Sequence, residues 1–266
     1  EKVPPLGQLA HVQSISLHTG GNVSNIAMNL KKLGFEAMLC TKIGRDSFGD
    51  FIKNQWEEHG IDTSYVIVDP DFETIVTAVC VAENAQRAFV CNSKEGQNIA
   101  SGEISKEMID KADLVFMADM YAYEPFLGRD IAPYFRYAKE QGKTTIADVM
   151  WCDAPDWMAH IEPILPYLDY FLPNNDEVYQ LTGLTDMAQA AELFADKGVK
   201  NVIIKMGAEG SLLRKQDGTL VKTPIFPVQA VDSTGAGDAF CSGFMAGLML
   251  ELPLEECCRL GSAVGA

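Results

Sequence analysis

The chain has 266 residues, of which 47% are hydrophobic and 22% are charged. This balance is typical of a globular protein and argues against a disordered, collagen-like or coiled-coil chain. The 21 basic and 37 acidic side chains give a formal net charge of -16. That charge argues against binding of nucleic acid or an anionic membrane by general attraction, so any anionic ligand has to be bound by local groups.

The sequence also carries information on cellular location and on the redox state of its cysteines. No segment approaches the roughly 20 apolar residues that a membrane span needs, and Glu1-Lys2-Val3-Pro4-Pro5 lacks the apolar core of a signal peptide. The seven cysteines are scattered and form no CxxC pair, so we expect reduced thiols. The sequence therefore predicts a cytoplasmic protein without membrane or nucleic-acid partners.

The first third of the chain predicts helices, one strand and a β-rich segment. Apolar residues recur at helical spacing over 22–33, 37–43 reads as a buried strand, and a second helix starts at Asp46 and ends at Gly60. Between 63 and 92 the β-rich runs 65–68, 74–81 and 87–91 are separated by turn signals with no helix between them. We expect a small separate β-sheet in this segment.

Beyond residue 92 strands and helices alternate. The predicted strands are 113–118, 144–148, 167–172, 202–205, 211–214 and 220–223, and the predicted helices are 129–141, 175–181, 187–197, 236–250 and 253–264. Strands joined through helices lie mostly parallel, with ligands at their carboxyl ends. We therefore expect a three-layer α/β/α domain formed by residues 1–62 and 93–266, from which the β segment 63–92 projects.

The most informative stretch runs from Asp232 to Phe240. In Gly235, Ala236 and Gly237 three small residues open a helix, so backbone N–H groups and the positive end of the helix dipole could approach an anion. Asp238, in the first turn, could then accept a proton from an attacking hydroxyl. A helix-capping role for Asp238 is the structural alternative.

Two further polar turns precede predicted helices. In one, Gly20 and Gly21 lead to Asn25, whose amide could hydrogen-bond a hydroxyl. In the other, Asn174 and Glu177 follow a strand and offer oxygen ligands that suit Mg²⁺, usually through water. Each turn could equally be a plain helix start, capped by a polar side chain.

Together these stretches resemble a known family. The run from Asp232 to Asp238 resembles the DTxGAGD signature of the ribokinase-like (PfkB) carbohydrate kinases, and it continues into Ala239-Phe240-Cys241-Ser242-Gly243-Phe244. Gly20-Gly21 with Asn25, Gly34 and Gly44 is similar to the family's N-terminal glycine signature. Asn174-x-x-Glu177 resembles its NxxE motif and Lys205-x-Gly207-x-x-Gly210 its nucleotide-side strand and turn. Four motifs in family order span most of the chain.

The resemblance implies a ribokinase-like fold and ATP-dependent phosphorylation of a hydroxymethyl group on a small sugar, with 63–92 as a lid. It implies that Asp238 is the base, that Gly235, Ala236 and Gly237 form the anion hole, and that Gly20, Gly21 and Asn25 line the substrate site. Asn174 and Glu177 would organise Mg²⁺, and Asp232 and Thr234 would contribute to a monovalent-cation site, for which K⁺ is the candidate. Lys205, Gly207 and Gly210 would lie near the nucleotide, with Thr234 beside them.

Several positions depart from the family pattern. Ribokinases proper carry a lysine where this chain has Asn22, which weakens the case for ribose, and Asp148-Val149-Met150 replaces the Asp-Pro-Asn of many fructokinases. Asp148 remains a candidate substrate contact, with a strand-end role as the alternative. Arg87 could reach a substrate from the lid or could be a solvated edge charge. Both chain ends look short for the family, so we expect a longer natural chain.

Two alternative functions stay open at this point. A nucleoside kinase of the same fold would need an aromatic platform, for which Tyr121, Tyr123 and Trp151 are candidates. A sugar-binding or regulatory protein would keep the fold without turnover. In each case a projecting lid exposes sheet edges, so we expect a homodimer formed through the lid.

Overall fold

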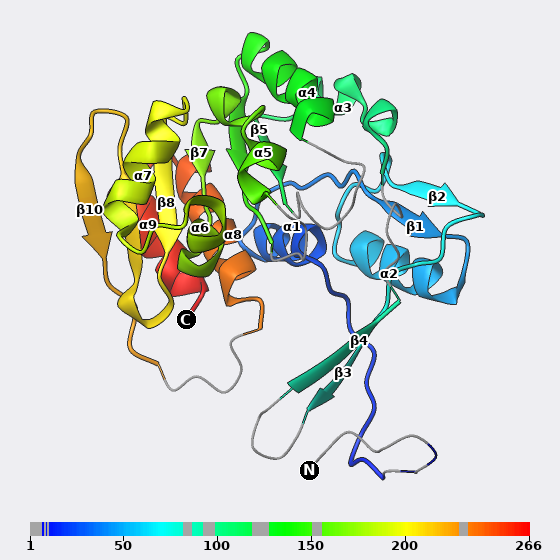
Figure 1. The fold of residues 1–266 in the computed structure, drawn as a ribbon. Helices are drawn as coiled ribbons and strands as arrows, with labels where there is room; N and C mark the ends of the chain where they lie inside the picture. The colour runs from blue at the N-terminus through cyan, green and yellow to red at the C-terminus, as the bar shows by residue number, and fades with distance from the viewer. Residues whose placement is uncertain are drawn as a thin grey trace.

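The computed structural model describes residues 7, 9, 11–81, 87–92, 99–118, 128–150, 156–228 and 234–266. Within them the central sheet has six strands, shown in Figure 1. In spatial order these are β10 (Leu220–Thr223), β9 (Ser211–Arg214), β8 (Asn201–Lys205), β7 (Tyr170–Phe171), β6 (Thr144–Ala147) and β5 (Leu114–Met117). Strands β5 to β8 are parallel, whereas β9 pairs antiparallel with both β8 and β10. The parallel strands therefore end at one common edge.

Helices cover both faces of this sheet. One layer packs on one face and comprises α4 (Gly128–Glu140), α5 (Trp157–Ile161), α6 (Asn175–Thr182) and α7 (Met187–Asp196). The other layer comprises α1 (Asn22–Lys32), α8 (Ala236–Met249) and α9 (Leu254–Val264). Alternate residues of β8 serve the two layers, because Ile203 packs toward α8 while Val202 and Ile204 pack toward α7. The predicted three-layer α/β/α fold is confirmed.

Short elements connect these layers. They are α3 (Lys106–Lys111) and the 3₁₀ turns η1 (Ser101–Glu103), η2 (Leu165–Tyr167) and η3 (Gly207–Glu209). Predicted and observed bounds agree closely for α4, α8 and α9, but α3 and α5 are too short to give a helical pattern in the sequence.

A smaller unit lies beside the main sheet. It contains β1 (Lys42–Gly44), α2 (Ser47–Glu58) and β2 (Ile67–Asp69), and β1 pairs with β2 in parallel. A cluster of buried residues that includes Trp56 packs α1 against α2 and β1. Here the structure differs from the prediction, since the β-rich run 65–68 joins β1 and does not contribute to the projecting sheet.

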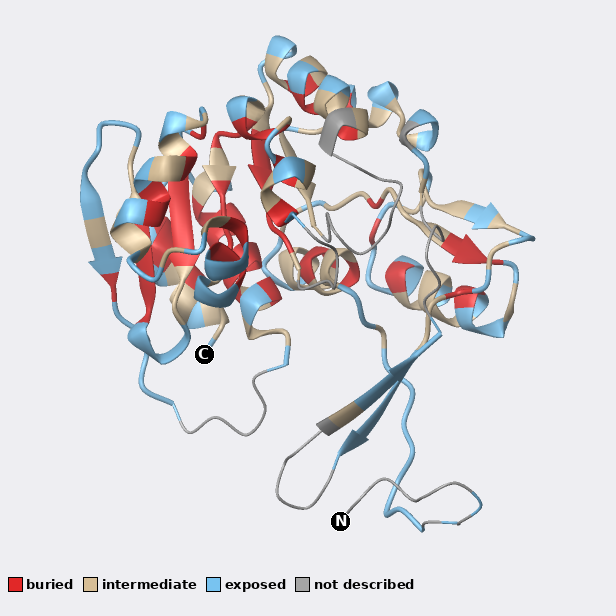
Figure 2. Cartoon of the chain, in the orientation of Figure 1, coloured by how far each residue is buried: buried red, intermediate tan, exposed pale blue. Residues whose placement is uncertain are grey.

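The projecting sheet is the antiparallel hairpin of β3 (Thr77–Val81) and β4 (Arg87–Cys91). Figure 2 shows it as a mostly exposed arm leaving the body of the protein. At its base Asn92 donates to the Thr74 carbonyl and accepts from the Val76 N–H, while Thr74 N–H donates to Asp46. These bonds anchor the arm to the start of α2.

No helix of the described part of the chain is long and apolar enough to cross a membrane.

Candidate active site

The start of α8 forms the centre of the candidate site. Gly235 precedes the helix with φ +79°, a left-handed conformation that glycine adopts without strain, and its carbonyl accepts from the Ala239 N–H at 2.8 Å. Asp238 is buried in the first helical turn. The turn therefore presents backbone N–H groups and one carboxylate at the positive end of a 14-residue helix.

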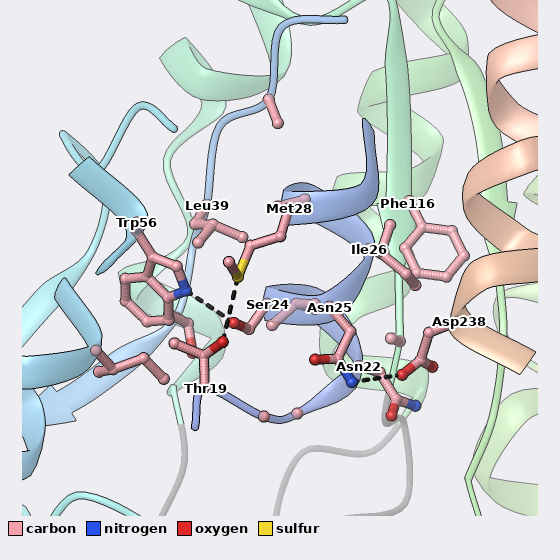
Figure 3. A pocket seen from close by; sticks show the side chains of 18 of the residues that line it. Thr19, Asn22, Ser24, Asn25, Ile26, Met28, Leu39, Trp56, Phe116 and Asp238 are labelled. Carbon is pink, nitrogen blue, oxygen red and sulfur yellow. Dashed lines mark hydrogen bonds between the residues drawn. The ribbon is translucent and has the colours of Figure 1, made fainter. Parts of the chain in front are cut away.

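Helix α1 brings Asn25 to this carboxylate from the other end of the sequence. The Asn25 amide Nδ2 donates to Asp238 Oδ2 at 2.8 Å, and Figure 3 shows the two side chains pointing toward each other. Gly21 enters α1 with φ +88°, and a Cβ on Gly20 or Gly21 would meet nothing within 4 Å. The backbone around the two glycines is thus open to a ligand.

One cavity joins these residues. Its lining includes the turns before α1 and α8 and, on the other side, the hairpin residues Val79, Val81 and Phe89. The predicted site residues that line it are Gly20, Gly21, Asn25, Thr234, Gly235, Gly237 and Asp238. Because Val79 and Phe89 are direct cross-strand partners, one face of the hairpin lines the same cavity as Asp238.

A buried ion pair lies behind the turn of α8. Lys205 is the last residue of β8, and Asp148 directly follows β6. The Lys205 Nζ lies 2.5 Å from Asp148 Oδ2. The second carboxylate oxygen of Asp148 accepts from the Val149 N–H. These bonds agree with a strand-end role for Asp148, while its contact with the substrate stays a prediction. Cys241 of α8 donates its thiol to Asp148 Oδ2 at 3.4 Å.

The NxxE motif begins α6 as a capping box. Asn174 Oδ1 accepts from the Glu177 N–H at 2.9 Å, and Glu177 Oε2 accepts from the Asn174 N–H at 2.7 Å. Both side chains thus serve a structural purpose, while Glu177 Oε1 takes no part in these bonds. Asn174 forms a β-bridge with Lys205, so the motif lies next to the ion pair.

Burial and nearby charges shift the pKa values of the acids at this edge upward. Burial and the charge of Asp148 raise the pKa of Glu177 to about 8. Burial raises the pKa of Asp238 above its usual value, which the Asn25 bond and Lys205 oppose and Asp148 reinforces. Although burial lowers the pKa of Lys205, the charge of Asp148 raises it above its usual range. The ammonium is therefore charged in a neighbourhood of carboxyl groups.

The turn after β8 contains two predicted nucleotide-side glycines with different surroundings. Gly210 has φ +86°, and a Cβ there would lie 2.0 Å from the Thr223 carbonyl oxygen, so packing alone requires glycine. Gly207 is exposed, and a Cβ there would meet nothing within 4 Å. Asp232, Tyr121, Tyr123, Trp151 and the side chain of Arg87 lie outside the described residues.

Comparison with known proteins identifies the family. The family model described as "pfkB family carbohydrate kinase" matches residues 2–266. The chain belongs to this family. It is 29% identical over 268 residues to a ribokinase of Haemophilus influenzae, covering 98% of this chain and 84% of the relative. It is 30% identical over 239 residues to an uncharacterized sugar kinase of Archaeoglobus fulgidus, covering 90% and 93% of the two chains.

The fold gives the same result. A structure of Arabidopsis thaliana ribokinase complexed with ribose and ATP matches with a TM-score of 0.83 and 25% identity, covering 100% of this chain and 86% of that one. The protein is thus a carbohydrate kinase, an enzyme that transfers a phosphoryl group to a sugar.

Sequence reasoning missed that Lys205 and Asp148 of this carbohydrate kinase form an ion pair. The motif suggested a nucleotide-side lysine and a separate substrate aspartate, but the structure pairs the two. A signal was available, because each residue ends a buried parallel strand, β8 or β6, and such ends meet at one edge of a sheet. The thiol of Cys241 gave no signal, because it occupies an ordinary apolar position of α8.

Proposed function

We propose that this kinase transfers the γ-phosphoryl group of ATP to a hydroxyl, of a hydroxymethyl type, on a small sugar. Asp238 acts as the base and Gly235, Ala236 and Gly237 form the anion hole. The observation that carries the proposal is the buried Asp238 carboxylate, held by Asn25 at the start of α8 and lining the same cavity as Gly20 and Gly21. This geometry supports the proposal, because the proton acceptor, the anion site and the glycine turn that would bind the sugar line one cavity.

In the proposed reaction the sugar hydroxyl oxygen forms a bond to the γ-phosphorus while the bond to the ADP oxygen breaks. The hydroxyl proton passes to Asp238, whose raised pKa brings it nearer to the operating pH. The N–H groups of the turn before α8 stabilise charge on the transferring phosphoryl group, with the helix dipole adding to their effect. Such a transfer depends mainly on positioning and charge stabilisation.

Mg²⁺ fits the carboxyl edge through Asn174 and Glu177. The pKa of about 8 for Glu177 comes first from burial and then from the negative charge of Asp148, and a nearby divalent cation would favour the ionised carboxylate. Among the described residues no group of three or more His, Cys, Asp or Glu side chains could hold a metal. Mg²⁺ would therefore keep several ligands from water and phosphate oxygens, and it would neutralise phosphate charge.

The remaining proposed site roles concern the monovalent cation, the nucleotide and the lid. Thr234 lines the cavity beside the anion hole and, together with Asp232, is our candidate for a K⁺ site. The open, exposed turn at Gly207 offers the nucleotide a close approach, whereas Gly210 supports the turn. Arg87, on the lid hairpin, stays our candidate for a substrate or phosphate contact.

The lid supports two further proposals. In the first, the face of the β3–β4 hairpin that lines the cavity closes over the bound sugar. In the second, the exposed apolar residues of the hairpin provide a surface on which two lids pair into a homodimer. A cytoplasmic location agrees with the seven cysteines, none of which forms a CxxC pair.

Measurement of ADP release from ATP and Mg²⁺ across pentoses, hexoses, keto-deoxy sugars and nucleosides, with K⁺ present, tests the proposal. We expect release that depends on one class of sugar, together with an equal amount of sugar phosphate. Release that depends only on a nucleoside would favour a nucleoside kinase. If no compound of the panel supports ADP release but a sugar raises the melting temperature of the protein, the result would favour a binding protein without turnover.

A further inference from the structure

The buried ion pair of Asp148 and Lys205 does more than connect two strand ends, because it lies next to the turn that begins α8. The Lys205 Nζ lies 3.8 Å from the position that a Cβ on Gly237 would take, so the ammonium sits directly beneath the turn that begins α8. The side chains of Lys205 and Asp148 are 13% and 5% exposed. The charge therefore acts on its neighbours with little screening by water.

The groups around Asp238 come from several elements. Asn25 of α1 donates a hydrogen bond, Cys241 lies one turn further along α8, and the charges of Asp148 and Lys205 act from the ends of β6 and β8. The charges of Asp148 and Lys205 also act on Glu177 of α6. Lys205 is the one cationic group that acts on Asp238 among these described neighbours.

A structural role alone gives a poor account of this pair. Taking two charges out of water costs free energy, and a pair of well-packed apolar residues often stabilises a fold as well or better. The residues that precede the two charged groups on the same strands, Ala147 and Ile204, are buried and apolar. An ion pair at this one position thus suggests a use for its charge.

We propose that Asp148 and Lys205 are positioning residues that set the charge state of Asp238: Lys205 keeps the Asp238 carboxylate ionised from beneath the anion hole, and Asp148 holds Lys205 in place. The inference rests on the proposed role of Asp238 as the base. It also assigns Lys205 to the base and the anion hole, where the motif alone suggested a contact with the nucleotide.

The electrostatic contributions have the signs that this role requires. Burial raises the pKa of Asp238, the charge of Lys205 lowers it, and the charge of Asp148 raises it. Removal of Lys205 should therefore move the acid limb of the rate profile to higher pH. Removal of the Asp148 charge should move the same limb to lower pH, because the ammonium is then no longer compensated.

The test measures kcat/KM for the sugar against pH, at saturating ATP and Mg²⁺, in three variants. We expect Lys205→Met to shift the acid limb upward by about one pH unit and Asp148→Asn to shift it downward. The double variant should return the limb toward that of the parent, since both charges are gone. Lys205→Met could fail to fold because it leaves Asp148 buried and unpaired, and in that case Asp148→Asn and the double variant carry the test.

Lys139→Met is the matched control, because Lys139 forms a partly buried ion pair with Asp169 at the opposite edge of the same sheet. It should leave the acid limb where the parent has it. Uniformly lower kcat/KM in the site variants, with an unmoved limb, would overturn the proposal and leave the pair a structural role. Asp238→Asn, assayed in parallel, separates the two claims. If Asp238→Asn keeps parental turnover, the proposed role of Asp238 as the base is wrong. If Asp238→Asn loses turnover while the acid limb stays fixed in the Lys205 and Asp148 variants, only the proposed role of the ion pair is wrong.

Discussion

The two edges of the central sheet use the same residue types to opposite effect. At the amino edge, before β7, one carboxylate faces two lysines: Asp169 is 2.6 Å from Lys139 Nζ and 2.9 Å from Lys200 Nζ. At the carboxyl edge the carboxyl groups of Asp148, Glu177 and Asp238 share one lysine, Lys205. One edge has a surplus of positive charge and the other a surplus of negative charge.

The pKa values reflect this difference. Burial works against the charge of Asp169, but hydrogen bonds from Lys139 and Lys200 hold the pKa below its usual value. At the other edge the pKa values of Glu177 and Asp238 are both raised. The amino edge is thus electrostatically satisfied and stabilises the fold, while the carboxyl edge is poised to accept protons and cations.

Apart from removal of the base itself, the largest effect should come from a change in the turn that begins α8. In Gly235→Ala the new Cβ would lie 4.0 Å from both Asn25 Nδ2 and Asp238 Oδ2, at φ +79°. These contacts leave room for the Cβ, but alanine is strained at this φ, and relief of the strain would move the N–H groups of the turn away from the phosphoryl group; we therefore expect kcat to fall about 100-fold. Steady-state assays at saturating substrates measure this.

Gly218→Ala is the matched control for backbone strain. Gly218 has φ +86° in the turn between β9 and β10, where a Cβ would meet nothing within 4 Å. Both variants should lose about 1 kcal/mol of stability, but Gly218→Ala should keep parental kcat. An equal loss of activity in both would show that strain, and not the anion hole, explains the result.

A change at the amino edge should affect stability and not turnover. Asp169→Asn would leave Lys139 and Lys200 without their carboxylate and weaken the acceptor of the Thr145 N–H and hydroxyl. We expect a loss of about 2 kcal/mol, less than for a fully enclosed pair, with kcat unchanged well below the melting temperature. Chemical denaturation measures the free energy of unfolding.

The pH dependence of this loss has a definite sign. Because the folded pKa of Asp169 is lowered, its stabilisation is present above the usual value of 3.8 and disappears as the pH falls through the folded pKa. The difference between parent and variant should therefore shrink in acid. A constant difference across that range would contradict the assignment of the ion pairs.

Glu177 should show the opposite pH dependence in metal-free protein. Its folded pKa of about 8 exceeds the usual 4.5, so the parent should lose stability as the pH rises between these values. Glu177→Gln cannot ionise and keeps an oxygen acceptor for the Asn174 N–H, so its stability should be flatter over the same range. Melting temperatures in the presence of a chelator measure this, and parallel curves for parent and variant would contradict it.

The smallest effect should be on assembly. Val90 is 65% exposed on the hairpin face that does not line the cavity. If two lids pair, Val90→Asp should weaken the dimer without changing the fold, as measured by sedimentation at micromolar concentration. A parent that sediments as a single chain of 29.1 kDa would remove the proposed dimer.

Much of this fold could be predicted from the sequence because its patterns are local. Helix α1 follows from apolar spacing and a glycine stop, and the α8 start follows from a run of small residues. The partner of β2 could not be predicted, since Ile67 pairs with Lys42, 25 positions earlier, and strand pairing over such a separation has no local pattern.

The site divides in the same way. Asp238 and the glycine turns stand together in one motif, and the structure brings Asn25 to them across 213 positions. The family resemblance and the kinase activity are confirmed, whereas the roles of the single residues stay predictions. The pairing of Lys205 with Asp148 depends on which strands are neighbours, and the motif containing Lys205 does not encode that.

The most direct test compares kcat of Asp238→Asn and Asp169→Asn with that of the parent, using the sugar that supports ADP release. Both substitutions remove one carboxylate charge, at opposite edges of one sheet. The account predicts a loss of ~10²–10⁴ for Asp238→Asn, because a positioned base is missing, and parental turnover for Asp169→Asn. Turnover of Asp238→Asn within about tenfold of the parent would contradict the central claim.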